Sequence, residues 1–296
     1  MSPRIALVTA RAAHGHDEDM PPLEAALAAC GARAEITDWD DPRVEWQRFD
    51  CALLRSAWDY AERRAEFLDW AARVSQLTRL VNPESVVRWN TDKHYLEDLA
   101  RAGAPVVASR FVEPGGDAGR ALDEFLRSAP CAELVVKPAV GAGARDARRH
   151  ARGARAAAGA HIAALLASGR SVLLQPYLAR VDRDGESALI YFEGRFSHAV
   201  RKGPLLPAGA ASTTALFAPE EISVHTPAPD ELEAAARVLG ALPFAIPLYA
   251  RVDLVRDEEG RSLLLELELT EPSLYFSRAP GSAERFAVAL VAGYVK

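Results

Sequence analysis

Short apolar runs alternate with amphipathic segments along the first third of the chain. The apolar runs predict three buried strands, at residues 4–9, 34–37 and 51–55. Pro21 and Pro22 open a segment with helical apolar spacing that ends at Gly31, and residues 62–77 place their large apolar side chains on one helical face. This alternation of strands and helices predicts a parallel sheet covered on both sides.

The pattern continues through the middle of the chain and changes after residue 185. Helices are predicted at 91–102, 119–127, 155–167, 230–242 and 283–291. Strands are predicted at 106–112, 133–137, 171–176, 187–192, 195–202, 246–255 and 261–269. Glu193-Gly194 between two of these strands is a hairpin signature, so the last third looks antiparallel. The predicted fold class is α/β, built from α+β lobes.

Residues 203–219 contain no charged side chain and are rich in Gly, Pro, Ala and Thr. We expect this segment to be a flap that orders over a reaction centre and excludes water. A rigid, buried connection is the competing interpretation.

Composition narrows the class of protein. The chain has 296 residues, which suggests about two domains at roughly 150 residues each. The net charge of −6 gives no reason to expect nucleic acid, and no apolar stretch has the length of a membrane span. Three scattered cysteines and the absence of a signal-peptide pattern predict a soluble, cytoplasmic protein. The oligomeric state stays open, a homo-oligomer included.

Lysine is rare in this chain. Only four of the 35 basic residues are lysines, and three of them, Lys93, Lys137 and Lys202, are internal. GC-rich coding, which favours arginine and alanine, explains the scarcity of lysine but not the positions at which lysine remains. A compact ammonium group is preferred where a planar guanidinium does not fit, so these three lysines are candidate site residues.

Two acidic motifs form the strongest local signal. RVD at 251–253 and ELE at 266–268 lie on strands joined by a turn, which places Asp253 beside Glu266, with Glu268 on the same face. Three converging carboxylates repel one another unless a cation lies among them, and removing one from a metal-free cluster would then stabilise the protein. Oxygen ligands of this kind suit Mg²⁺. A solvent-facing strand edge is the alternative interpretation.

Two further segments have features of a nucleotide site. LVVKP at 134–138 ends in Lys137 and is followed by a small-residue loop with Gly141 and Gly143, which can hold phosphate through an ammonium and backbone N–H groups. The segment LLQPYL at 173–178 ends a buried strand in a Pro-constrained hinge whose backbone can contact a base edge. An ordinary turn and an interdomain linker are the respective alternatives.

Taken in order, these segments resemble the ATP-grasp ligases of the glutathione synthetase type over nearly the whole chain. The similarity includes DK at 92–93, QPYL at 175–178, GE at 185–186, and E-x-E-x-T-x-P at 266–272. RSAWDY at 55–60, RWNTDKHYL at 88–96 and HAVRK at 198–202 are similar to a bacterial subgroup that includes the cyclo-ligase of cycloserine biosynthesis, which closes O-ureidoserine to a ring. Family members commonly have Asn where this chain has Glu268.

The resemblance implies an ATP-grasp fold with an N-terminal parallel domain (1–88), a small lid (89–176) and a C-terminal antiparallel domain (177–296). It implies ATP and Mg²⁺ as cofactors. The implied ATP-binding residues are Lys93, Lys137, Gly141, Gly143, Gln175, Tyr177, Leu178 and Glu186. The implied metal ligands are Asp253, Glu266 and Glu268, and the implied catalytic basic residues are Arg201, Lys202 and Arg251.

The implied activity is ATP-dependent carboxylate–amine ligation through an acyl phosphate, with ring closure of O-ureidoserine as the specific reaction. A ligase for amino acids or dipeptides and a non-catalytic nucleotide-binding regulator are the alternatives. For the small amino-acid substrate, Arg55 at a strand's carboxyl end is a candidate for a bidentate contact with a carboxylate. Asp17 and its neighbour Asp19 are candidates for an ammonium group, with Trp58 and Tyr60 as pocket walls.

Overall fold

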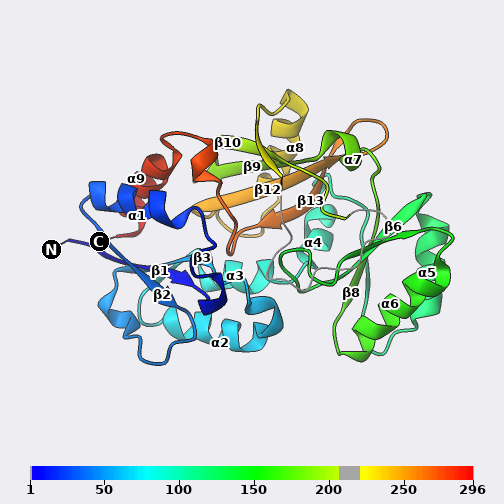
Figure 1. The fold of residues 1–296 in the computed structure, drawn as a ribbon, viewed down its shortest axis with the longest axis horizontal. Coiled ribbons are helices and arrows are strands. Elements are labelled where there is room, and N and C mark those ends of the chain that lie inside the picture. The colour runs from blue at the N-terminus through cyan, green and yellow to red at the C-terminus, as the bar shows by residue number, and fades with distance from the viewer. Residues whose placement is uncertain (1, 207–220, 296) are drawn as a thin grey trace.

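A computed structural model describes residues 2–206 and 221–295 (Figure 1). Residues 207–219 of the predicted flap lie outside these ranges. Three sheets are present in the described chain, and we call them the N-terminal, central and C-terminal sheets. None of the helices in the described ranges combines the length and the apolar character that crossing a bilayer requires.

The N-terminal sheet is parallel, as predicted, with the order β2-β1-β3-β4. Its strands are β1 (Arg4–Thr9), β2 (Arg33–Asp38), β3 (Cys51–Ser56) and β4 (Arg79–Val81). Alternate residues of β1 serve two cores. Ile5 and Leu7 pack with α1 (Met20–Ala29) and α9 (Ser282–Tyr294), whereas Ala6 and Val8 face an aromatic cluster against α2 (Arg64–Val74). The C-terminal helix therefore packs on the lobe that begins the chain.

The central sheet is antiparallel, with the order β5-β8-β6-β7. Its strands are β5 (Arg110–Val112), β6 (Glu133–Pro138), β7 (Arg148–Ala151) and β8 (Val172–Pro176), and its helices are α5 (Ala118–Ser128) and α6 (Arg155–Ala167). The strand predicted at 106–112 is shorter because Val106 forms a bridge to Leu264 of another sheet. The edge strand β7 was not predicted, because its sequence, RRHA, is mostly polar and lacks the apolar run that indicates a strand.

The C-terminal sheet is also antiparallel, with the order β11-β10-β9-β12-β13. Its strands are β9 (Glu186–Phe192), β10 (Arg195–Lys202), β11 (Ile222–His225), β12 (Tyr249–Arg256) and β13 (Ser262–Glu268). The accompanying helices are α3 (Glu84–Asn90), α4 (Tyr95–Arg101), α7 (Val181–Asp184) and α8 (Pro229–Gly240). This sheet and α8 enclose a core that also receives Leu96 and Leu99 of α4.

The helix predicted at 91–102 begins only at residue 95, and α3 before it was not predicted. The cause is Asn90, whose buried amide donates to the Leu267 carbonyl and accepts from the Leu269 N–H and the Thr270 hydroxyl. These bonds anchor the end of α3 to β13. The chain consequently turns before α4, and Lys93 lies in that turn. The domain boundaries at 88/89 and 176/177 stay a prediction.

Candidate functional site

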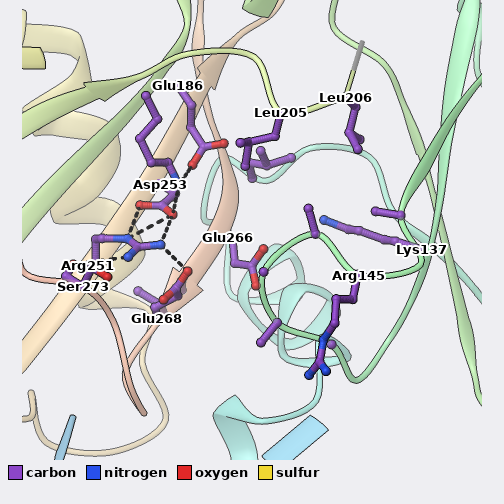
Figure 2. A pocket seen from close by; sticks show the side chains of 18 of the residues that line it. Lys137, Arg145, Glu186, Leu205, Leu206, Arg251, Asp253, Glu266, Glu268 and Ser273 are labelled. Carbon is purple, nitrogen blue, oxygen red and sulfur yellow. Dashed lines mark hydrogen bonds and ion pairs between the residues drawn. The ribbon is translucent and has the colours of Figure 1, made fainter. Parts of the chain in front are cut away.

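A cavity of about 410 Å³ lies between the three lobes, each of which is one of the three sheets with its helices and loops. Residues from all three lobes line the cavity (Figure 2). Asp17, Trp58 and Tyr60 line it from the N-terminal lobe. Lys93, Lys137, Gly141, Gly143, Gln175, Tyr177 and Leu178 line it from the central segments. The C-terminal sheet contributes Glu186, Lys202, Arg251, Asp253, Glu266 and Glu268. Residues far apart in the sequence thus meet in one cavity.

The two lysines of the central segments differ in their environment. The Lys93 Nζ lies 2.9 Å from the Glu266 Oε1 and donates to the Gly141 carbonyl at 2.7 Å, so it ties β13 to the small-residue loop. Lys137 leaves β6 and points into the cavity from the side opposite Asp253 (Figure 2). Within the described residues its ammonium forms no ion pair. Burial lowers the pKa of Lys137 to about 8, and the nearby Lys93 adds to the lowering.

The acidic cluster is held by the protein's own cations. Asp253 lies opposite Glu266 in the β12–β13 register, as predicted. Asp253 accepts hydrogen bonds from Lys202 at 2.8 Å and from Arg251 at 2.9 Å. Lys202 also pairs with Glu186. Arg251 also pairs with Glu268 (Figure 2). Burial raises the pKa of Asp253, but Arg251 and Lys202 outweigh it and hold the pKa well below its usual range.

This arrangement corrects the argument that the three carboxylates require a metal to coexist. Lys93, Lys202 and Arg251 already supply three positive charges. In the part of the chain that the structure describes, no group of three or more His, Cys, Asp or Glu side chains is placed to hold a metal ion. Glu266 and Glu268 keep 28% and 27% of their side chains exposed, whereas Asp253 keeps only 1%. Glu266 and Glu268 therefore fit a cation better than Asp253 does.

Arg201 does not reach the cavity, which corrects its predicted place beside the phosphates. Its guanidinium donates to the Asp184 carbonyl at 2.7 Å and contacts the His225 ring. Successive residues of a strand point to opposite faces, so Lys202 enters the cavity and Arg201 lies behind the sheet.

Arg55 is also displaced from its predicted role. Its side chain is 0% exposed and does not line the cavity. It donates to the Asp19 carboxylate at 3.2 Å and to the Pro272 carbonyl at 3.1 Å. Asp19 in turn accepts the backbone N–H groups of Leu274, Tyr275 and Phe276. This pair binds the loop after β13, and of its two members only Asp19 lines the cavity.

Three of the residues predicted to bind the substrate, Asp17, Trp58 and Tyr60, do line the cavity, at its N-terminal side. Asp17 is 7% exposed, and its Oδ2 has no hydrogen-bond partner within the described residues. Burial raises the pKa of Asp17, although Arg55 partly opposes this. Tyr60 packs on Phe67, and the Trp58 indole donates to the Glu271 carbonyl at 3.0 Å.

Arg145, Glu271 and Tyr275 are among the cavity residues that the sequence did not predict. Arg145 of the small-residue loop donates to the Trp58 carbonyl and pairs with Glu62, which joins the central loop to the N-terminal lobe. Glu271 and Tyr275 line the cavity from the loop after β13. The sequence shows a basic residue, Arg145, in the glycine loop and a third acidic residue, Glu271, shortly after Glu266 and Glu268. Neither pattern indicates which lobe the side chain faces.

Comparisons with known proteins agree with this geometry. A family model described as D-cycloserine synthetase DcsG, N-terminal domain, matches residues 5–82. The cycloserine biosynthesis protein DcsG of Streptomyces lavendulae is 44% identical over 293 residues, which is 97% of each chain. A crystal structure of D-cycloserine synthetase DcsG is 41% identical and superposes with a TM-score of 0.90, covering 98% of this chain and 99% of that one.

More distant structures share the fold alone. The D-alanine–D-alanine ligase of Bacillus anthracis has a TM-score of 0.68 at 13% identity, covering 99% of this chain and 96% of that one. The ATP-grasp ligase PsnB has a TM-score of 0.66 at 17% identity, with 99% of both chains covered. The predicted resemblance and fold class are confirmed, and the chain belongs to the D-cycloserine synthetase DcsG family of ATP-grasp ligases.

Proposed function

We propose that this protein uses ATP to close a small amino-acid derivative, O-ureidoserine, to the ring of D-cycloserine. The observation that carries the proposal is one cavity, shared by three lobes, in a chain 44% identical over 97% of its length to a cycloserine biosynthesis protein. Lys137 enters this cavity from the side opposite the carboxylates of β12 and β13, which suits a nucleotide bound between them.

We infer that ATP lies between the central and C-terminal sheets. Lys93 and Lys137 would contact its phosphates, together with backbone groups around Gly141 and Gly143. Gln175, Tyr177 and Leu178 would border the adenine, and Glu186 would face the ribose after exchanging its contact with Lys202. Cations held in place by the protein neutralise charge on a transferring phosphoryl group without having to move during the reaction. This electrostatic stabilisation is usually the largest contribution that a protein makes to phosphoryl transfer.

Mg²⁺ is the metal that this donor set fits. Glu266 and Glu268 present carboxylate oxygens to the cavity and would hold it, whereas Asp253 would act through Lys202 and Arg251. When bound, the ion supplies charge neutralisation at the phosphates.

The substrate end of the cavity has residues of matching chemistry. We infer that Asp17 binds the α-ammonium group and that Trp58 and Tyr60 enclose the side chain. A carboxylate is a poor electrophile, and phosphorylation gives it a good leaving group. Lys202 and Arg251 lie next to the acids of β12 and β13 and would stabilise negative charge on the reacting carboxyl group. Attack of the side-chain N–H nitrogen on the acyl carbon would form the C–N bond, expel phosphate and release the proton of that nitrogen. Water would then remove the carbamoyl group from the ring nitrogen as carbon dioxide and ammonia. Holding nitrogen and carboxyl group in one small cavity favours the ring closure by proximity.

The test is a measurement of phosphate release and product formation with ATP and Mg²⁺ across a panel of amino acids that contains O-ureidoserine, serine and alanine. We expect O-ureidoserine to give ring product and the highest turnover. Two-substrate ligation of alanine without turnover of O-ureidoserine would establish the dipeptide ligase instead.

Replacing Lys137 by methionine is expected to weaken binding of a non-hydrolysable ATP analogue by about 10- to 150-fold at pH 7, the loss of one charge-assisted hydrogen bond. The pKa of Lys137 is about 8, so the charge is present below that pH and is lost above it. Calorimetric titration of the wild-type protein should therefore show affinity falling from pH 7 to pH 9, with a flatter profile for Lys137→Met. Arg127→Met, an exposed cation of α5, is the control. Equal pH profiles would remove Lys137 from the phosphate site.

Replacing Glu266 by glutamine is expected to lower turnover by about 10- to 100-fold, the range seen when a metal site loses one supporting group, and raised Mg²⁺ should partly restore it. From the sequence alone, removing one carboxylate is expected to stabilise the metal-free protein. The ion pair between Glu266 and Lys93 reverses this expectation for that protein. Its melting temperature should fall, because Lys93 loses its partner. Glu259→Gln in the exposed β12–β13 turn is the control. A loss of turnover that no Mg²⁺ concentration relieves would contradict a metal ligand at Glu266.

A further inference from the structure

Glu271 is a buried carboxyl group that the mechanism above does not use. It is 8% exposed and lines the cavity. Within the described residues its carboxyl group has no hydrogen bond and no ion pair. A carboxyl group that lines the cavity and that no described protein group pairs with is available to a ligand there. Asp17, at the same N-terminal side of the cavity, has a buried carboxyl oxygen, Oδ2, that accepts no hydrogen bond within the described residues and lies 3.9 Å from the Arg55 Nε.

The backbone that carries Glu271 is held from the N-terminal lobe. The Trp58 indole donates to the carbonyl of Glu271 itself, and Arg55 donates to the carbonyl of Pro272 next to it. Asp19 accepts three N–H groups of residues 274–276. A side chain on a backbone fixed by this many bonds is preorganised, as a binding residue needs to be.

The surroundings of Glu271 select the chemistry of its ligand. Burial raises the pKa of Glu271 well above its usual range, and the nearby Glu268 and Glu266 add to this. Lys93 and Arg251 oppose the shift, but both are already paired with other carboxylates, Lys93 with Glu266 and Arg251 with Asp253 and Glu268. A negatively charged ligand group would add repulsion here, whereas an N–H donor would satisfy the carboxyl oxygens. The surroundings of Glu271 therefore favour a ligand group with an N–H donor.

We propose that Glu271 binds the nitrogen that attacks the activated carboxyl group, by accepting a hydrogen bond from its N–H. This inference rests on the proposed function, because closing a C–N ring needs such a nitrogen in the side chain of the same substrate. Asp17 would bind the α-ammonium group and Glu271 the side-chain nitrogen, so the two carboxyl groups would bend the substrate towards closure. The ligand class is an amino acid whose side chain carries an uncharged N–H group.

Separating carboxyl activation from ring closure tests the proposal. The variants are Glu271→Gln, which keeps one acceptor oxygen, and Glu271→Leu, which keeps none. Activation is measured as ATP-dependent hydroxamate formation when hydroxylamine traps the acyl phosphate of O-ureidoserine, and closure is measured as ring product. Glu97→Gln, a half-exposed acid of α4, is the control. Melting temperature and binding of a non-hydrolysable ATP analogue verify that each variant is folded.

We expect the ratio of ring product to hydroxamate to fall by about 2- to 12-fold in Glu271→Leu, the net contribution of one hydrogen bond between uncharged groups, and by less in Glu271→Gln. An unchanged ratio in both variants, whether or not total activity falls, overturns the proposal and leaves Glu271 a structural residue. Failure of the proposed function has a different signature, because the wild-type protein would then form neither hydroxamate nor ring product from O-ureidoserine.

Discussion

Replacing Arg55 by methionine is expected to lower the free energy of unfolding by about 3–5 kcal/mol, the cost of breaking a buried ion pair by removing one partner. Methionine fills most of the volume but leaves Asp19 without its guanidinium partner and the Pro272 carbonyl without its donor. The Arg55 side chain is completely buried, so solvent cannot compensate. Urea unfolding measures the loss.

Arg43→Met is the matched control for Arg55. Arg43 also pairs with an aspartate, Asp41, but its side chain is 82% exposed. Exposed pairs contribute little, so this variant should unfold close to the wild type. A stability loss in Arg55→Met no larger than in Arg43→Met would show that Arg55 is not the anchor of the loop after β13. It would also reopen a direct substrate contact for Arg55.

Replacing Lys202 by methionine is expected to cost a similar 3–5 kcal/mol, because two buried carboxylates, Asp253 and Glu186, would lose their shared cation. Asp253 keeps its bonds to Arg251, whereas Glu186 keeps none of comparable strength. The double variant Lys202→Met, Glu186→Gln should therefore regain part of the lost stability, since it removes the carboxylate left unpaired.

A double-mutant cycle of Lys202 and Glu186 tests whether Lys202 is the cation that Glu186 depends on. We expect a coupling energy of about 0.5–3 kcal/mol between Lys202 and Glu186, the range for charged residues in one network. The regained stability should come without regained turnover, because neither variant restores the cation beside Asp253. Strictly additive effects on stability would contradict the shared-cation arrangement, and full recovery of turnover would contradict a role for Lys202 in the reaction.

Features that depend on local periodicity follow from the amino-acid sequence. Two predicted strands, 246–255 and 261–269, joined by a short turn were enough to predict that Asp253 lies opposite Glu266, because strand geometry alternates side chains whatever surrounds them. Turn residues located the hairpin at Glu193-Gly194, where both residues have positive φ. The scarcity of lysine pointed to Lys93, Lys137 and Lys202, and all three line one cavity.

Features that depend on a distant partner were decided by tertiary structure. Arg55 at the end of a strand looked like a substrate ligand, but its partner carbonyl at Pro272 is 217 residues away, and no local pattern encodes that pairing. The same holds for the cations among the acids of β12 and β13, which come from β10 and from the turn before α4 as well as from Arg251. Burial and charge compensation are set by all elements packed around a group, so a sequence pattern can identify a carboxylate but not the ion that neutralises it.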